Sequence, residues 1–117
     1  MKIQQIAEIL DAKILCGADR VDGIVKSACG CDMMSDVLAF VKDQAVLLTG
    51  LCNPQVVRTA EMMDMKCIVF VRGKIPPESV IELADEAGLV VLSTEERMYV
   101  ACGKLYSNGL AGGGTEA

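Results

Sequence analysis

Three short segments of the sequence carry residue types from which an anion-binding site can be built. The first is Thr49-Gly50-Leu51-Cys52-Asn53, which follows an apolar run and precedes Pro54. Asn53 is a favoured N-cap residue and Pro54 suits the first helical position, so the segment predicts a strand–turn–helix junction. Such a junction directs backbone N–H groups and the positive end of the helix dipole toward one point. A phosphate or carboxylate binds well there.

The other two segments follow the next two apolar runs of the chain. Arg72-Gly73-Lys74 follows residues 67–71, and Ser93-Thr94 follows residues 89–92. Open parallel sheets bind ligands beyond the carboxyl ends of their strands, so we expect these segments to meet. The predicted site consists of Thr49, Gly50, Asn53, Arg72, Gly73 and Lys74. Turns and N-caps require the same residue types whatever a protein does, so purely structural turns are the alternative. Neither a Walker A sequence nor a dinucleotide glycine fingerprint is present.

A second candidate site is made of thiols. Cys29 and Cys31 lie two residues apart at the expected end of a strand, where they could bind a soft metal or form a redox pair. Cys102 could supply a further thiolate. Zinc and iron–sulfur sites usually take four ligands in C-x2-C pairs, so a metal site is the alternative hypothesis, and a dimer could pool thiols from two chains. Otherwise these cysteines are small apolar packing residues.

The composition narrows the classes of function. The absence of histidine removes the commonest general base, and we predict that the chain is not an enzyme. The net charge of −5 argues against a nucleic-acid surface. No apolar run approaches the ~18 residues of a membrane span, and six cysteines without a secretory signal indicate the reducing cytoplasm. An apolar content of 52% in 117 residues predicts a subunit interface, and hence a homodimer.

The order of elements predicts the fold. From residue 45 onward, continuous apolar strands (45–48, 67–71, 89–92) alternate with helices (54–64, from 78, and 95–107). This pattern is typical of a mainly parallel sheet covered on both faces, an α/β fold with three layers, α/β/α. We expect a helix over 2–10, strands over 13–16 and 23–30, and a short helix with Val37 and Val41 that Asp32 or Ser35 caps. Ser93 and Glu96 predict a capping box. Residues 1–110 are expected to form one domain, and 111–117 a disordered glycine-rich tail.

Five segments of the sequence form a further pattern: CDMMSDVL at 31–38, LTGL at 48–51, NPQVVRTA at 53–60, IVFVRGK at 68–74 and ACGKLY at 101–106. Together they resemble a stand-alone DRTGG domain, a family named after its common residues. The residues that match the family's name are Asp36, Thr49, Gly50, Arg58 or Arg72, and Gly73. The resemblance implies an α/β/α domain similar to the N-terminal domains of HPr kinase/phosphorylase and of a Mur ligase.

The resemblance also implies a role. DRTGG domains resemble regulatory modules, often homodimeric, that accompany CBS domains in pyrophosphatases regulated by adenine nucleotides. Stand-alone members resemble proteins encoded near iron-only hydrogenases. We therefore expect a cytoplasmic, non-enzymatic regulatory or accessory domain that binds a small anion such as an adenine nucleotide. The alternatives are a zinc or iron–sulfur accessory protein with a hydrogenase partner, using Cys29, Cys31 and Cys102, and an interaction module without a ligand.

Overall fold

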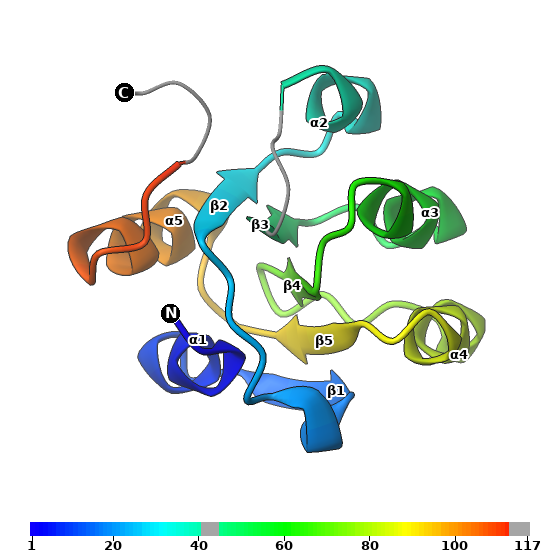
Figure 1. Cartoon of the computed structure of the whole chain (residues 1–117), viewed down its shortest axis with the longest axis horizontal. Coiled ribbons are helices and arrows are strands. Elements are labelled where there is room, and N and C mark those ends of the chain that lie inside the picture. Colours follow the sequence, from blue (N-terminus) through cyan, green and yellow to red (C-terminus); the bar gives the residue numbers. More distant parts are fainter. Residues whose placement is uncertain (41–44, 113–117) are drawn as a thin grey trace.

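The strands form one five-stranded sheet (Figure 1). The computed structural model describes residues 1–40 and 45–112. Four strands run parallel to one another, and the first strand, β1 (Lys13–Cys16), pairs antiparallel with the last. The parallel strands are β2 (Ser27–Gly30), β3 (Ala45–Thr49), β4 (Cys67–Phe70) and β5 (Val90–Ser93). The order across the sheet is β1-β5-β4-β3-β2, so the predicted mainly parallel α/β sheet is confirmed.

The helices form a layer on each face of the sheet (Figure 1). One layer contains α1 (Ile3–Ile9) and α5 (Met98–Ser107), and the other contains α2 (Met34–Phe40), α3 (Pro54–Met62) and α4 (Glu78–Glu86). A short 3-10 helix, η1 (Ala18–Arg20), follows β1. Successive residues of a strand point to opposite faces. In β3, Val46 and Leu48 therefore join the core beside α1 and α5, whereas Ala45 and Leu47 join the core on the other side.

The carboxyl ends of the four parallel strands finish nearly level. Gly30 of β2 is in register with Leu48, Thr49 of β3 with Phe70, and Phe70 of β4 with Ser93. The loops that leave these strands therefore start from one edge of the sheet, which we call the carboxyl edge. All of the segments predicted to bind an anion leave the sheet there.

Residues near both ends of the described chain bond to β2 or to the segment that precedes it. The Met1 amino group donates a hydrogen bond to the Val25 carbonyl (3.0 Å), and the Val25 N–H donates to the Met1 carbonyl (2.9 Å). Near the other end, the Ala28 N–H donates to the Ala111 carbonyl (2.9 Å). The strand predicted over 23–30 was therefore too long, because the chain before Ser27 pairs with the N-terminal residues instead of with β3.

The start of α2 differs from the prediction. The helix begins at Met34, so Ser35 lies inside it, and neither Asp32 nor Ser35 is the N-cap residue. The Asp32 side chain instead contacts the end of β3. Val37 is buried against the second core, as predicted. Val41 and the tail from residue 113 lie outside the described residues.

The predicted capping box at Ser93 and Glu96 is also wrong. Ser93 is the last residue of β5, and its hydroxyl donates to the Lys74 carbonyl (2.8 Å). The N-cap of α5 is Arg97, which lies several residues further on. The hydroxyl of Ser93 is therefore used to join two loops of the carboxyl edge rather than to begin a helix.

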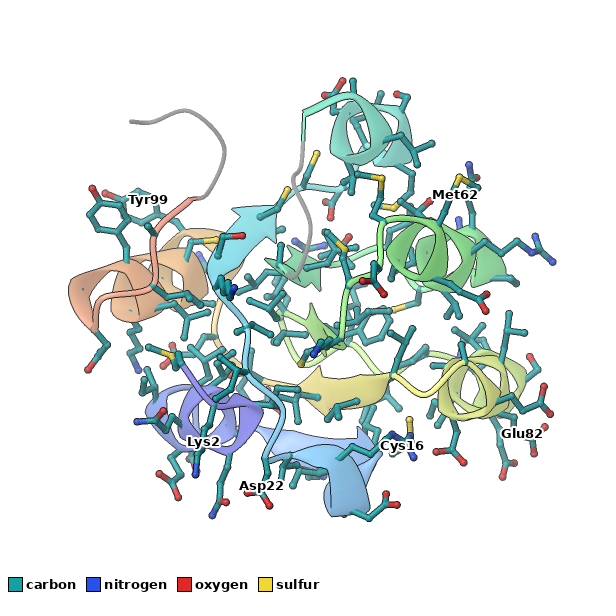
Figure 2. The ribbon with its side chains drawn as sticks, in the orientation of Figure 1. Lys2, Cys16, Asp22, Met62, Glu82 and Tyr99 are labelled. Atoms are coloured by element: carbon teal, nitrogen blue, oxygen red, sulfur yellow. The ribbon has the colours of Figure 1, made fainter. Side chains whose placement is uncertain are left out.

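Some large apolar side chains are exposed. Tyr99 and Tyr106 of α5 are 89% and 73% exposed, and Figure 2 shows Tyr99 projecting away from the sheet. Met62, at the end of α3, is also exposed. The longest helix among residues 1–40 and 45–112 has ten residues, and none there combines the length and apolar character needed to cross a bilayer.

Candidate functional site

The turn after β4 has an unusual backbone. Arg72 and Gly73 both have positive φ, 59° and 68°, and the Lys74 N–H donates to the Val71 carbonyl (3.1 Å). Positive φ at both central positions is the mark of a type I′ turn, which favours Gly, Asn or Asp. Arginine in the left-handed region costs about 1–2 kcal/mol. The surroundings must therefore hold Arg72 in this conformation.

Three hydrogen bonds tie this turn to the chain that leaves β5. The Arg72 N–H donates to the Glu96 carbonyl (2.8 Å), and the Gly73 N–H donates to the Thr94 carbonyl (2.8 Å). The Ser93 hydroxyl reaches the Lys74 carbonyl, as described above. Because three hydrogen bonds fix its backbone, the turn keeps its conformation despite the strain at Arg72.

The Arg72 guanidinium lies against the backbone of Gly50, at the end of β3. A Cβ atom added to Gly50 would overlap Nη2 of Arg72 and would lie 2.8 Å from its Cζ. The exposed guanidinium occupies the space that a side chain at position 50 would take. The predicted site residues Thr49, Gly50 and Arg72 are thus neighbours in the structure, although Arg72 comes from a different loop.

Asp32 is a part of this site that the sequence reasoning had assigned to helix capping. Its Oδ1 accepts hydrogen bonds from the Gly50 N–H (2.8 Å) and from the Thr49 hydroxyl (2.8 Å). The bond from the Gly50 backbone, then that from Thr49 and the positive charge of Arg72, hold the pKa of Asp32 below its ordinary value. Asp32 is therefore a carboxylate at neutral pH. Asp36, which was matched to the family's aspartate, is exposed in the first turn of α2.

The turn amides at the carboxyl edge are largely in use. The Gly50 N–H donates to Asp32, the Leu51 N–H donates to the Thr49 hydroxyl oxygen (3.1 Å), and the Gln55 N–H donates to the Asn53 side chain (3.0 Å). Asn53 is thus the N-cap of α3, as its position predicted. An anion at this edge would therefore depend mainly on charged side chains rather than on these three amides.

Two cations supply that charge. Arg72 and Lys74 are both exposed, and neither forms an ion pair with a residue in the part of the chain that the structure describes. The Cys52 thiol lies among these charges: burial raises its pKa, while Lys74 and then Arg72 lower it and Asp32 raises it. Asp32, Thr49, Gly50, Arg72 and Lys74 are together called the carboxyl-edge site below.

The three cysteines of the alternative metal site do not converge. Cys29 and Cys31 pack with the core beside α2 and α3, whereas Cys102 packs with the core on the opposite face. Gly30 lies between them and faces α5, because a Cβ there would lie 2.6 Å from the Cys102 Sγ. Burial, and then the neighbouring Cys31 and Cys102, raise the pKa of Cys29 to about 11.

These thiols therefore lack the properties of a metal site in a single chain. Among residues 1–40 and 45–112, no group of three or more Cys, Asp or Glu side chains is arranged to hold a metal ion. The Cys31 Sγ is within hydrogen-bond distance of the Met33 backbone (3.3 and 3.4 Å), which makes it part of the turn before α2.

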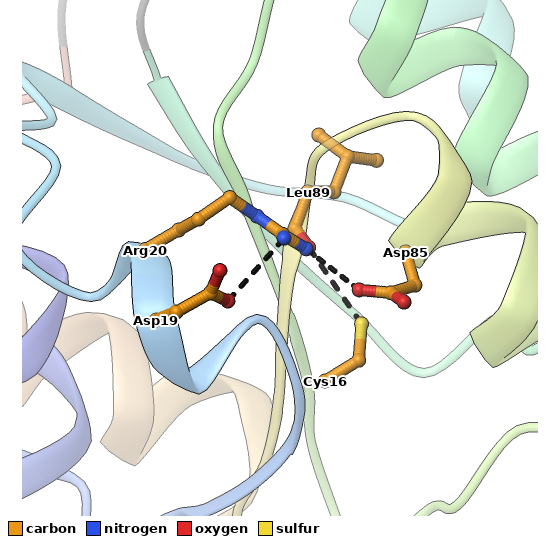
Figure 3. Close-up of polar contacts among 5 residues, drawn as sticks. All are labelled: Cys16, Asp19, Arg20, Asp85 and Leu89. Carbon is orange, nitrogen blue, oxygen red and sulfur yellow. Dashed lines mark hydrogen bonds and ion pairs between the residues drawn. The ribbon is translucent and has the colours of Figure 1, made fainter.

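A separate polar cluster surrounds Arg20 (Figure 3). Its guanidinium donates to Asp85 of α4 (2.8 Å) and to the Leu89 carbonyl (2.9 Å), and Asp19 lies 3.4 Å away. The last turn of α4 contains no basic residue of its own. Arg20 therefore supplies the positive charge that favours a helix C-terminus, and it joins η1 to α4.

The fold and the carboxyl edge define an open α/β domain with charged side chains gathered where such sheets bind ligands. The chain belongs to the DRTGG domain family, whose profile matches residues 5–106. No curated protein matches the sequence.

One similar solved structure is the crystal structure of the CBS and DRTGG domains of the regulatory region of Clostridium perfringens pyrophosphatase, complexed with the activator diadenosine tetraphosphate. The TM-score is 0.67 at 16% sequence identity, over 86% of this chain. This chain spans 44% of that one. At this identity, the likeness shows the α/β fold, and the DRTGG domain of that protein belongs to a regulatory region.

Proposed function

We propose that this chain is a non-enzymatic regulatory domain that binds an adenine nucleotide at the carboxyl-edge site. The observation that carries the proposal is the position of Arg72. A strained turn, fixed by three hydrogen bonds, holds a guanidinium against Gly50 beside the exposed Lys74. Backbone strain that the surroundings maintain is a common property of ligand sites.

Arg72 and Lys74 favour an anionic ligand, although the Glu95 carboxylate lies against Gly73 between them. Arg72 and Lys74 form no ion pair with a described residue, although the whole chain carries a net charge of −5. Phosphate groups form charge-assisted hydrogen bonds with arginine and lysine. The activator in the pyrophosphatase structure contains adenosine and phosphates, which makes adenine nucleotides the first ligands to test.

We propose further that the domain works as a homodimer in the cytoplasm. The exposed Tyr99 and Tyr106 of α5 support an interface on that helix, because tyrosine is enriched in protein interfaces. All six cysteines are unpaired, which agrees with a reducing compartment.

A thermal-shift titration tests nucleotide binding. The panel contains AMP, ADP, ATP, diadenosine tetraphosphate, GTP and inorganic tripolyphosphate. A ligand at about ten times its Kd stabilises the fold by roughly 1.4 kcal/mol, which raises the Tm by about 5 °C. Arg72→Ala should abolish the shift, and Arg58→Ala, which removes an exposed arginine from α3, should retain it.

The two variants also locate the site. Loss of the shift in Arg58→Ala alone would place the ligand on α3 and reject the carboxyl-edge site. If millimolar concentrations of the whole panel leave the Tm of the wild type unchanged, the nucleotide-binding function is rejected.

A further inference from the structure

Asp32 presents a carboxylate oxygen that the protein itself does not use. Its Oδ1 already accepts two hydrogen bonds, from Gly50 and Thr49, and these fix the orientation of the carboxylate. Oδ2 has no hydrogen-bond partner among the described residues, and the residue is exposed. A carboxylate has about four lone-pair positions, so Oδ2 can accept hydrogen bonds from a ligand.

This carboxylate has the wrong sign for a site that binds phosphate alone. A negative charge close to Arg72 weakens the attraction of the site for any anion. The arrangement instead suits a ligand with two different parts, an anionic group for Arg72 and Lys74 and a hydroxyl-bearing group for Asp32. A ribonucleotide has both parts.

We propose that Asp32 makes the carboxyl-edge site specific for ribonucleotides, by accepting hydrogen bonds from the ribose hydroxyls while Arg72 and Lys74 bind the phosphates. This inference rests on the proposed function. The strand order supports it, because Asp32 follows β2, Gly50 follows β3 and Arg72 follows β4, which are successive neighbours. The acceptor and the guanidinium meet at the middle of these three strands, because the Asp32 carboxylate accepts a hydrogen bond from the Gly50 N–H and the Arg72 guanidinium lies against the same residue.

The same division of roles is known in other α/β sheets. In dinucleotide-binding folds, the phosphates lie at one strand–helix junction, and an acidic residue some way along the chain binds the ribose 2′-hydroxyl. Here the phosphates would bind the side chains of Arg72 and Lys74 after β4 instead of a strand–helix junction, and the acidic residue comes from the loop after β2.

Isothermal titration of the full chain with four probes tests the proposal: ATP, 2′-deoxy-ATP, 3′-deoxy-ATP and inorganic tripolyphosphate. The wild type should bind ATP about tenfold more tightly than at least one deoxy analogue, because a hydrogen bond to a charged acceptor is lost. Asp32→Asn should bind ATP and the deoxy analogues equally. The same variant should bind tripolyphosphate roughly threefold more tightly, since one negative charge has been removed.

Asp36→Asn is the matched control. It removes the same charge from an exposed position one turn further along, so it should preserve the preference for ribose. Equal affinity of the wild type for ATP and both deoxy analogues would overturn this inference and leave nucleotide binding intact. Absence of binding by all four probes would overturn the proposed function itself. The wild-type comparison needs no variant, so a poorly folded Asp32→Asn would not prevent the decision.

Discussion

Replacing Arg72 tests whether the turn after β4 is strained. We compare Arg72→Gly with Arg72→Ala, because both remove the guanidinium and its contact with Gly50. The two variants differ only in how well they tolerate a φ of 59°. Glycine adopts positive φ without a steric penalty, whereas the Cβ of alanine meets the same obstruction as that of arginine.

The expected difference follows from two opposing effects. At an ordinary position, glycine is less stable than alanine by about 0.5–1 kcal/mol, because it loses more conformational freedom on folding. At a left-handed position, the non-glycine residue costs about 1–2 kcal/mol, which exceeds that entropy loss. We therefore predict that Arg72→Gly is more stable than Arg72→Ala by about 0.5–1 kcal/mol, or roughly 2–4 °C in Tm.

The assay is urea unfolding followed by far-UV circular dichroism, without ligand, with the midpoint and the m-value fitted separately. Both variants should fail to bind the nucleotide panel, so the stability gain of Arg72→Gly would come without function. If Arg72→Gly is less stable than Arg72→Ala at equal m-values, the turn is not strained as described. The backbone of Arg72 would then no longer support a ligand site at this turn.

The remaining predictions concern Asp32, Arg20 and the oligomer. The pKa of Asp32 is lower in the folded protein than in the unfolded chain, where it is about 3.9. The ionised carboxylate therefore stabilises the fold fully above about pH 3.9, and this stabilisation is lost as the pH falls through the lower pKa of the folded state. The urea concentration at the unfolding midpoint should therefore be higher for the wild type than for Asp32→Asn at pH 7, and the difference between the two midpoints should be smaller at pH 3. An equal difference at both pH values would contradict this prediction. Arg20→Ala breaks the contact with Asp85 and should lower the Tm by about 4 °C in a thermal melt, because a lost hydrogen bond costs about 1 kcal/mol. An unchanged Tm would show that the contact contributes no stability. Light scattering of the wild type should give a mass of twice the 12.4 kDa chain. The double variant Tyr99→Glu, Tyr106→Glu should have the mass of one chain, and a monomeric wild type would reject the dimer.

The parallel sheet could be predicted from the sequence because its strands carry the signal themselves. Residues 45–48 are apolar at every position, which only burial on both faces explains, and Asn53-Pro54 marks the start of the helix that follows. Both signals are local, so the presence of a parallel sheet with covering helices could be predicted without the strand order, which depends on distant contacts.

The site was only partly predictable because its geometry depends on strand order. Asp32 precedes a short helix and has the chemistry of an N-cap, and nothing local reveals that β2 lies beside β3. Ser93 was misjudged for the same reason, since its hydroxyl bonds to Lys74, 19 residues away in the chain. Arg72 is not a residue that favours positive φ, so only its bonds to the segment after β5 account for its conformation.

The positions of the cysteines relative to one another also depend on strand and helix order. Cys29 and Cys31 pack with the same core, on the side of α2 and α3. Which face α5 covers is a property of the whole topology, and it places Cys102 on the other side. A glycine is required at position 30 because Cys102 of α5 packs directly against it, and not because of a metal site.

The attachment of both chain ends to the stretch before and within β2 has a mechanical consequence. Met1 is held by Val25 and Ala111 by Ala28, so the two anchoring points are three residues apart, or about 10 Å of extended chain. Loosening of either contact would therefore act on the same short stretch of chain, residues 25–28. Because Asp32 follows β2 by two residues and its side chain bonds to Gly50, a disturbance of this stretch would also act on the carboxyl-edge site.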